Sequence, residues 1–432
     1  MNLGMTTRST LDDHRGGLRD EPVSSYVQGV IHDADSHVME TAGWLLDHAD
    51  PSVKDRLDPL WMRGLADFAD RALDAVEDLK HTDEGNATLE AELLDRKNWW
   101  ALGASQPADR SRALDLLGFS SQLVFATHSS RTLLTPIDQA VVASAGGPPS
   151  PPTEPDLVYG LVRAHNRAMA AFCADDPRLL AVGWFRMDDP ARALAAATEA
   201  IALGCAAIEI PAYPVGPRSI THVDHEPFYA LLAEAGVPLL FHLGSGGENP
   251  PRVYRNTGRE VFQDPEGNSD PVRPLRVVGL APPVEMALAA LIFDGVLERH
   301  PNLKVGATEL GAVWVPGFLR RLDLAVTLDK KMRGDHGHRP GDLELLPSEY
   351  VTRQVRFTPF TDEPLDWVIS QTDPSMYLFS SDYPHAEGGT DPYGEFLAAL
   401  AGFDAAVHEQ FLRTNFEWFL GARVPAPAAS SR

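Results

Sequence analysis

Two carboxylates and an imidazole stand at alternate positions in the stretch VIHDADSHVME, which covers residues 30–40. The apolar residues around them predict a buried strand, and successive side chains of a strand point to opposite faces. We therefore expect Asp33, Asp35 and His37 to share one face. Buried charges must be paired or must bind a cation. The stretch thus predicts one side of a cation site.

Three later stretches place further metal-capable side chains where an apolar run ends. The run ending in FHLG contains His242, the run ending in TELG contains Glu309, and SSDYPH contains Asp382 and His385. The carboxyl ends of barrel strands meet at one face of the molecule. We therefore expect these side chains to converge with those of the first stretch, which favours a single cation site over separate roles.

Each of these residues also has an ordinary structural interpretation. An Asp before a helix is most often an N-cap, which would account for Asp382. His242 could be a satisfied core histidine, and Glu309 could pair with Arg356 on the following strand. Asp33 is the member of the first group that we expect to be structural, because it lies deeper in the barrel.

The elements that would position these residues alternate along the chain. Eight short apolar runs are expected to be strands: residues 29–37, 121–127, 179–187, 205–211, 237–244, 303–310, 354–360 and 376–382. Helical patterns lie between them: residues 155–176, 190–204, 226–236, 282–301 and 317–328. This alternation predicts parallel β/α construction. A closed (β/α)8 TIM barrel fits eight strands best, with an open doubly wound sheet as the alternative.

Three long insertions interrupt the alternation, and each follows a predicted strand. They cover about residues 44–112, 128–156 and 244–282. Loops in these places lie over the C-terminal face of a barrel, where barrel enzymes hold their sites. We expect Trp99, Trp100 and Tyr254 to line an apolar, aromatic-binding pocket there. Packing of the insertions against the core is the alternative for these side chains.

The composition limits the partners of the chain. Its 432 residues carry a formal net charge of −24, which argues against nucleic acid or an anionic membrane as the main partner. Cys173 and Cys205 are too few for a disulfide framework and fit a reducing cytoplasm. No apolar run reaches the length of a membrane span. We expect a flexible arm without a secretory signal at 1–25, one domain at 26–423 and a disordered tail at 424–432.

Taken together, the quoted pieces resemble the amidohydrolase superfamily, specifically the amidohydrolase-related branch called amidohydrolase family 2. The resemblance rests on DADSHVMET, VPLLFHLGSG, LIFDGVLERHPNLKVGATELGAVWVPGFLRRLD and FSSDYPHAEGG, and it covers about residues 30–422. It implies a metal-dependent (β/α)8 barrel. The branch includes decarboxylases, hydratases and hydrolases of small, often aromatic or carboxylated substrates. Relatives are commonly dimers or larger, so a homodimer is expected.

The resemblance implies roles for individual residues. His37 and His242 would be metal ligands, and Asp382 would be a ligand or a proton shuttle. Asp35 stands where the superfamily usually has the first histidine of its motif and where some decarboxylases have Glu. Glu309 stands where many members have a catalytic histidine, so a carboxylate replaces an imidazole at that position.

The candidate ligands include two imidazoles and three carboxylates. This mixture suits one or two ions of Zn, Mn or Fe and is too nitrogen-rich for a simple Ca site. The fourth strand offers Glu209 and no lysine, which argues against a carbamylated lysine between two metals. His385 and His128 are candidates to orient a ligand, with an ordinary loop histidine as the alternative. His128 is also expected to line the substrate pocket with Trp99, Trp100 and Tyr254.

The leading hypothesis is metal-assisted hydrolysis or decarboxylation of a small substrate. The metal would polarise a carbonyl or carboxylate or activate bound water, while Asp382 or Glu309 would move the proton, with His385 as a further catalytic candidate. A mono- or di-iron oxygenase acting on a hydrophobic carboxylated metabolite is the alternative, because two His and a carboxylate also form non-haem iron sites. A non-catalytic binding protein is the third hypothesis.

Overall fold

The structure is a computed structural model of the whole chain. It describes the following residues: 29–57, 59–60, 66–129, 154–213, 217–244, 254, 274–333 and 343–425. The predicted arm at 1–25 lies outside the described residues, as do residues 426–432 of the predicted tail and most of the insertions at 128–156 and 244–282.

Seven parallel strands form one sheet whose order follows the chain from β1 to β7. Their bounds are β1 His32–Val38, β2 Ser121–Ala126, β3 Leu179–Trp184, β4 Ala207–Glu209, β5 Leu239–His242, β6 Val305–Thr308 and β7 Val355–Phe357. Each strand pairs in parallel with the next, so every connection crosses back over the outside of the sheet, usually by a helix.

The predicted eighth strand closes the ring without forming a regular ladder. The Leu378 N–H donates to the carbonyl of Phe357 on β7, at 2.9 Å, and the Ala34 N–H of β1 donates to the carbonyl of Phe379, at 2.9 Å. Residues 377–383, called here the closing segment, therefore join the two edge strands of the sheet. The (β/α)8 barrel predicted from the sequence is confirmed, with an irregular eighth strand.

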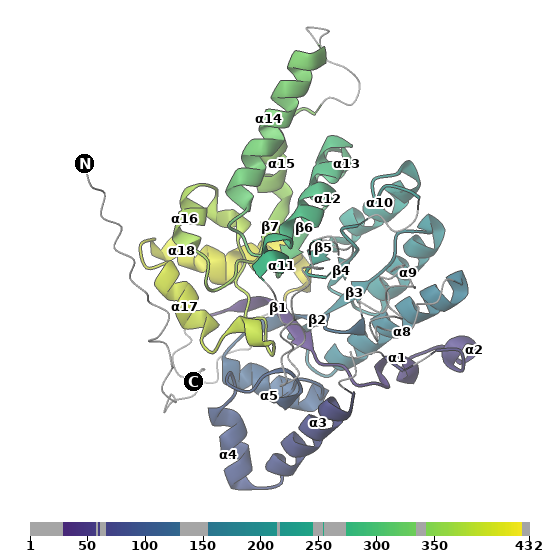
Figure 1. Cartoon of the computed structure of the whole chain (residues 1–432), viewed down its shortest axis with the longest axis vertical. Helices are drawn as coiled ribbons and strands as arrows, with labels where there is room; N and C mark the ends of the chain where they lie inside the picture. The colour runs from purple at the N-terminus through teal and green to yellow at the C-terminus, as the bar shows by residue number, and fades with distance from the viewer. Residues whose placement is uncertain are drawn as a thin grey trace.

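Helices surround this sheet on the outside (Figure 1). Those of the first insertion are α1 Trp44–Asp47, α2 Pro51–Lys54, α3 Ala66–Lys80, α4 Asp83–Ala91 and α5 Pro107–Leu117. Those that connect the strands are α8 Pro155–Cys173, α9 Pro190–Ala202, α10 Glu226–Ala235, α11 Pro274–Val278, α12 Ala281–Phe293, α13 Val296–Arg299, α14 Val315–Arg333 and α15 Pro347–Gln354. The last are α16 Leu365–Ser370, α17 Pro392–Ala399, α18 Ala405–Glu409 and α19 Asn415–Leu420.

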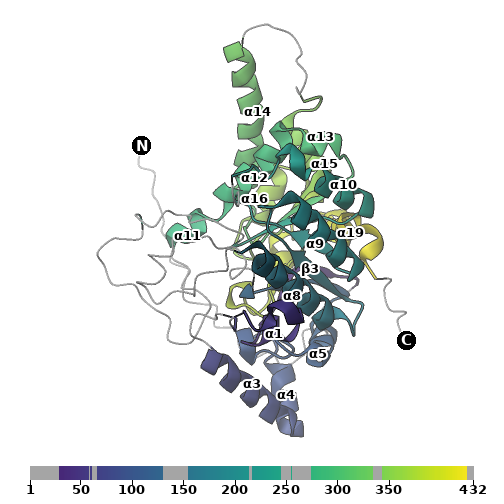
Figure 2. The same ribbon diagram turned by 90° about the vertical axis from the view of Figure 1, so that its right-hand side faces the viewer.

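The helical patterns seen in the sequence correspond to α8, α9, α10, the pair α12 and α13, and α14. In both views α14 extends beyond the other helices (Figures 1 and 2). Within the described ranges, no helix is both long and apolar enough to cross a membrane.

Helix α19 fills the interior of the barrel from the end opposite the strand carboxyl ends. Its Phe416 and Phe419 are buried in one cluster with inward-facing strand residues such as Leu123 and Leu240. A Cβ at Gly306 on β6 would lie 2.4 Å from Leu240 Cδ2 and 2.9 Å from Phe419 Cζ, so glycine is needed for this close packing. The base of the barrel is therefore apolar and filled, which leaves the opposite end for polar chemistry.

Candidate metal centre

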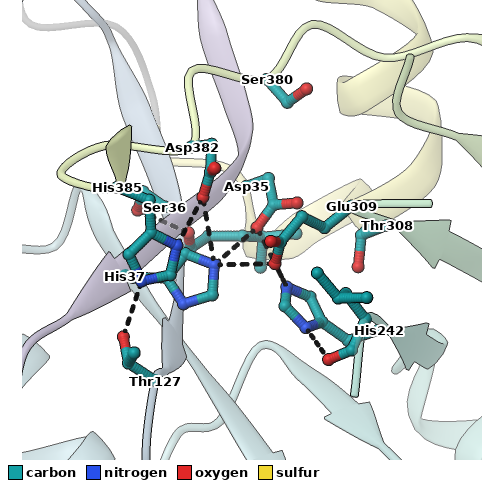
Figure 3. A network of polar contacts seen from close by, with 12 residues as sticks. Asp35, Ser36, His37, Thr127, His242, Thr308, Glu309, Ser380, Asp382 and His385 are labelled. Atoms are coloured by element: carbon teal, nitrogen blue, oxygen red, sulfur yellow. Dashed lines mark hydrogen bonds and ion pairs between the residues drawn. The ribbon is translucent and has the colours of Figure 1, made fainter. Parts of the chain in front are cut away.

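A β-bulge in β1 decides which of its acidic side chains face the barrel interior. The pairing with β2 shifts register between Asp33, which lies opposite Gln122, and Ser36, so β1 contains one extra residue there. Asp33 consequently faces outward with Gln122, whereas Asp35 and His37 face inward (Figure 3). The prediction that all three share one face is wrong for Asp33.

On the outer face of β1, Asp33 anchors the closing segment. Its carboxylate accepts hydrogen bonds from Gln122 Nε2 at 2.8 Å, from the Ser381 N–H at 2.8 Å and from the Ser381 hydroxyl at 2.5 Å. Arg110 of α5 is fully buried and donates to Gln122 Oε1 at 3.1 Å and to the His37 carbonyl at 2.9 Å. We call Asp33, Gln122, Arg110 and Ser381 the outer network. Burial raises the pKa of Asp33 to about 7, against the effect of its hydrogen bonds.

On the inner side, six buried side chains meet at the carboxyl ends of the strands (Figure 3). We call them the inner cluster: Asp35, His37, His242, Glu309, Asp382 and His385. Asp35 and His37 come from β1, His242 ends β5, Glu309 follows β6, and the other two lie at and just after the end of the closing segment. The structure thus brings together all five metal-ligand candidates of the sequence.

The nitrogen and oxygen atoms of the inner cluster are spaced like the ligands of a metal ion. His37 Nε2 lies 3.3 Å from Asp35 Oδ1, 3.5 Å from Glu309 Oε2 and 3.5 Å from Asp382 Oδ1. His242 Nε2 lies 3.3 Å from Asp35 Oδ1 and 3.1 Å from Glu309 Oε2. Ligands held about 2.0–2.2 Å from an ion are roughly 3.0–3.5 Å apart. The residues therefore fit a metal in spacing.

Hydrogen bonding fixes the orientation of the His242 lone pair. His242 Nδ1 lies 3.0 Å from the Leu243 carbonyl, which can only accept, so Nδ1 carries the proton. In the neutral imidazole, Nε2 then presents a lone pair to the oxygens of Asp35 and Glu309. Neither ring nitrogen of buried His37 has a hydrogen-bond partner. Lone pairs that face one another in a buried site require a cation between them, so the donor chemistry also fits a metal.

The pKa shifts of the inner-cluster residues show that the site favours positive charge. Burial lowers the pKa of a histidine, yet Asp35 and Glu309 raise the pKa of His37 well above its ordinary value and that of His242 to about 9. Burial raises the pKa of a carboxyl, yet the two imidazoles hold that of Asp35 below its ordinary value. Burial and the charge of Asp382 raise the pKa of Glu309. Because a metal must displace protons from His37 and His242, acid is expected to weaken its binding.

Two members of the inner cluster hold a strained backbone. Glu309 has φ of 54° and Asp382 has φ of 52°, in the left-handed region that non-glycine residues rarely adopt. The Glu309 N–H is held by the Thr358 hydroxyl at 2.9 Å, and the Asp382 N–H by the Asp35 carbonyl at 2.8 Å. Strain of this kind persists where surrounding contacts impose it, and it is concentrated at functional sites.

Arg356 does not neutralise Glu309. Its guanidinium lies over the ring of Trp418, 3.7 Å from the ring centre, and donates to the Val355 carbonyl at 2.8 Å. Glu209, at the end of β4, is buried near the cluster, and burial raises its pKa to about 7. Because Arg356 lies against Trp418, Glu309 is left facing the imidazoles of His37 and His242.

Behind the cluster, Glu40 fixes the loop that follows β2. Its carboxylate accepts hydrogen bonds from the backbone N–H groups of Thr127 at 3.1 Å, His128 at 3.0 Å and Ser129 at 2.8 Å. This places the Thr127 hydroxyl 3.0 Å from His385 Nε2. Sequence reasoning missed Glu40 and Thr127. A carboxylate that binds backbone N–H groups has no characteristic spacing to other residues, and Thr127 contacts a histidine far away in the sequence.

The aromatic residues expected to line a pocket lie elsewhere or are not placed against the cluster. Trp99 is fully buried in the core, and its ring stacks on that of buried His128 with centres 5.2 Å apart. Trp100 is half-buried against Phe68, with ring centres 6.1 Å apart. Tyr254 is 64% exposed. Trp99 therefore packs as core, while a substrate role for the other residues stays a prediction.

A small pocket does open onto the inner cluster. Its lining residues are Asp35, Glu309, Asp382, Thr358, Pro359, Phe360, Thr361, Ser380, Ser381, Glu387 and Gly388. Residues 358–361 directly follow β7. Their position at the end of a barrel strand is the sequence feature that could have predicted their place at the site. The pocket combines acidic groups with the apolar surface of Phe360.

A family model described as Amidohydrolase matches residues 130–421, which is more than half of the chain. The chain belongs to the amidohydrolase family. The match begins after β1, so the contribution of Asp35 and His37 to the site rests on the structure. The comparison with curated proteins gave no match.

Solved structures share the fold along nearly the whole chain. An amidohydrolase from Mycobacterium avium subsp. paratuberculosis is 21% identical, with a TM-score of 0.66 over 92% of this chain and 99% of that one. A 5-carboxyvanillate decarboxylase from Novosphingobium aromaticivorans, with bound manganese, is 17% identical, with a TM-score of 0.56 over 90% and 97%. A 2,6-dihydroxybenzoate decarboxylase from Rhizobium is 14% identical, with a TM-score of 0.58 over 91% and 99%.

Proposed function

We propose that this protein is a metal-dependent enzyme that decarboxylates a small carboxylated aromatic substrate. The observation that carries the proposal is the convergence of imidazole lone pairs and carboxylates at the barrel mouth, open to a pocket. The named structural neighbours include decarboxylases of substituted benzoates, which favours this reaction among those of the family. We propose Mn²⁺ as the first metal to test, because the Novosphingobium aromaticivorans decarboxylase holds manganese.

In this reaction the chain's own residues bind the cation, admit the substrate and move a proton. Asp35, His37 and His242 would hold the metal, which would polarise the substrate carboxylate and stabilise developing negative charge. The bond from the ring carbon to the carboxylate breaks, carbon dioxide leaves, and a proton must reach that carbon. We propose Asp382 or Glu309 as the residue that delivers it, because both line the pocket that opens onto the cluster.

The test uses the metal-free protein, reloaded with Mn²⁺, and substituted benzoates such as 2,6-dihydroxybenzoate and 5-carboxyvanillate. We expect metal-dependent release of carbon dioxide from at least one carboxylated aromatic compound in such a panel. Asp382→Asn should lower kcat by about 10²–10⁴-fold, the usual contribution of a positioned proton donor. Absence of carbon dioxide release across the panel would contradict decarboxylation.

Hydrolysis is the second candidate, and membership of the amidohydrolase family favours it. The same cluster would then activate a water molecule against an ester, amide or lactone. Turnover of such compounds by the Mn²⁺-loaded protein, with carboxylated aromatics left intact, would select hydrolysis. The iron oxygenase alternative gains no support from the comparisons and stays a prediction, testable by iron content and oxygen consumption.

The homodimer expected from the sequence is also a proposal. The exposed end of α14 presents apolar side chains one turn apart, Leu324, Leu328 and Met332, which a second copy could cover. Light scattering should then give twice the chain mass of 47.1 kDa. A monomeric mass at micromolar concentration would contradict it.

A further inference from the structure

One carboxylate ties together the loops that follow β6 and β7. Glu363 accepts hydrogen bonds from the backbone N–H groups of Ala312 at 2.7 Å, Val313 at 2.9 Å and Phe360 at 3.0 Å. Ala312 and Val313 belong to the loop after β6, whereas Phe360 belongs to the loop after β7. An ionised carboxylate only accepts, so it matches a set of three donors. The Glu363 side chain therefore fixes the two loops relative to each other.

Gly311 shows how closely these groups approach one another. Its φ is 66°, and a Cβ at this position would lie 2.5 Å from Glu363 Oε1 and 3.0 Å from Phe360 Cδ2. The Gly311 carbonyl accepts a hydrogen bond from the Trp314 indole N–H at 2.9 Å. Glycine is needed here both for the left-handed backbone and for the close contact. The ring of Phe360 thus lies against backbone that is itself held in place.

Phe360 also lines the pocket at the inner cluster. Among the described residues that line this pocket, Phe360 is the only aromatic one; the others are carboxylates, hydroxyl-bearing residues, Pro359 and Gly388. The residue is half-buried. Aromatic rings prefer offset or edge-to-face contacts with one another, so a ring of fixed orientation favours an aromatic ligand.

Capping of a helix does not account for the position of Glu363. The residue lies just before α16, yet none of the hydrogen bonds described for its carboxylate goes to that helix, as those of a capping side chain would. Burial raises the pKa of Glu363, against the effect of its three hydrogen bonds, so placing a carboxylate here is costly. Its contacts all serve loops at the mouth of the barrel.

From these contacts we infer that Glu363 is a positioning residue that fixes Phe360 as the aromatic wall of the pocket, and that this wall receives the ring of an aromatic ligand. The inference deepens the proposed function and rests on it for the aromatic class of the ligand. Glu363 acts through the backbone of Phe360 and does not touch the ligand. Its loss should therefore change which rings the pocket prefers.

The experiment compares the binding of two probes, benzoate and cyclohexanecarboxylate, to the Mn²⁺-loaded full chain by titration calorimetry. The probes carry the same charge and differ in whether the six-membered ring is aromatic. We expect the wild type to bind benzoate about 3–10-fold more tightly, which is the range of an aromatic contact expressed as a ratio of dissociation constants.

Variants of Phe360 and Glu363 test the source of that preference. Phe360→Leu should abolish the preference and Phe360→Tyr should keep it. Glu363→Gln turns an amide donor towards backbone donors and should reduce the preference to less than about twofold. The double variant of Glu363→Gln and Phe360→Leu should match Phe360→Leu alone, because residues that act through one contact are not additive.

The control is Glu349→Gln, which changes another carboxylate that accepts a backbone N–H, that of Leu346 at 2.7 Å. Glu349 does not line the pocket, and this variant should keep the preference of the wild type. If Glu363→Gln does not fold, Gly311→Ala provides the same test, because its Cβ would displace the Glu363 carboxylate.

Equal binding of the two probes by the wild type, or binding of neither, would overturn the inference. A preference that survives Glu363→Gln, or additive losses in the double variant, would overturn the role of Glu363. The proposed function is judged separately by carbon dioxide release. A normal ring preference without any such release would overturn decarboxylation and support the positioning role.

Discussion

The two faces of β1 carry buried polar networks of opposite character. In the outer network, both oxygens of Asp33 accept hydrogen bonds, and Arg110 donates to Gln122 and to a backbone carbonyl. In the inner cluster, the nitrogens of His37 and one oxygen of Asp382 have no hydrogen-bond partner. A buried network whose groups are satisfied stabilises one structure, whereas one with unpartnered atoms is prepared for a ligand.

Two aspartates separated by a single residue thus have different functions. Asp33 and Asp35 are both buried, and the bulge between Asp33 and Ser36 puts them on opposite faces. The comparison predicts that changes in the inner cluster remove metal with little effect on the fold, while changes in the outer network destabilise the fold and spare the metal.

The largest expected effect is in the inner cluster. His37→Ala or His242→Ala should reduce bound metal from stoichiometric to near zero and abolish activity, because each removes a nitrogen that faces two or more carboxylate oxygens. Elemental analysis measures the metal, and circular dichroism checks that the barrel is folded. Full metal content in either variant would refute the assignment of these ligands.

The largest effect on stability is expected in the outer network. Arg110→Met removes a fully buried charge that links α5, β1 and β2, and should lower the free energy of unfolding by about 3–5 kcal/mol. Urea denaturation measures the loss. The folded fraction should still bind metal; a variant of normal stability without metal would reverse the roles of the two networks.

A third prediction concerns His32, an inward-facing residue of the same strand at the apolar base. Burial lowers its pKa to about 4, against the charge of nearby Glu417. Below about pH 6.5 the unfolded chain takes up a proton that the folded chain does not, so stability should fall between pH 6.5 and 4, by about 3 kcal/mol at most. Urea denaturation across this range should show a shallower pH slope for His32→Gln. Equal slopes would contradict this.

The smallest effect is expected for Asp33→Asn. The amide keeps one oxygen acceptor but turns a donor towards the Gln122 and Ser381 donors, which should lower the free energy of unfolding by about 1–3 kcal/mol. Metal content should not change. Loss of metal in this variant, with a stable fold, would instead indicate that Asp33 is a metal ligand.

Much of the barrel could be predicted from local sequence patterns. Each strand is a short apolar run, and helices such as α9 and α10 have clear periodicity and end near glycine. The eighth strand was harder, because residues 377–383 form isolated hydrogen bonds to two neighbours rather than a ladder. The residues next to Trp99 in the sequence could not show whether it lies in the core or in a pocket. Its burial depends on contacts with α3 and with the loop after β2.

The candidate site was predictable in its residue types and only partly in its geometry. The position of His242 and Glu309 at strand ends follows from the apolar runs that precede them. The bulge does not, because an extra residue in β1 has no local signature in DADSH and is defined only against β2. Glu40, Thr127 and Thr358 act on backbone groups or on a histidine far away in sequence, so only the folded chain identifies them.

By itself the sequence determined which metal-capable side chains are available, because residue type and strand-end position set which donors reach the mouth of a parallel barrel. The tertiary structure decided which donors face each other. It turned Asp33 outward, paired Arg356 with Trp418 rather than Glu309, and fixed the His242 lone pair through the Leu243 carbonyl. Those choices depend on contacts between segments far apart in the chain, and no local pattern encodes them.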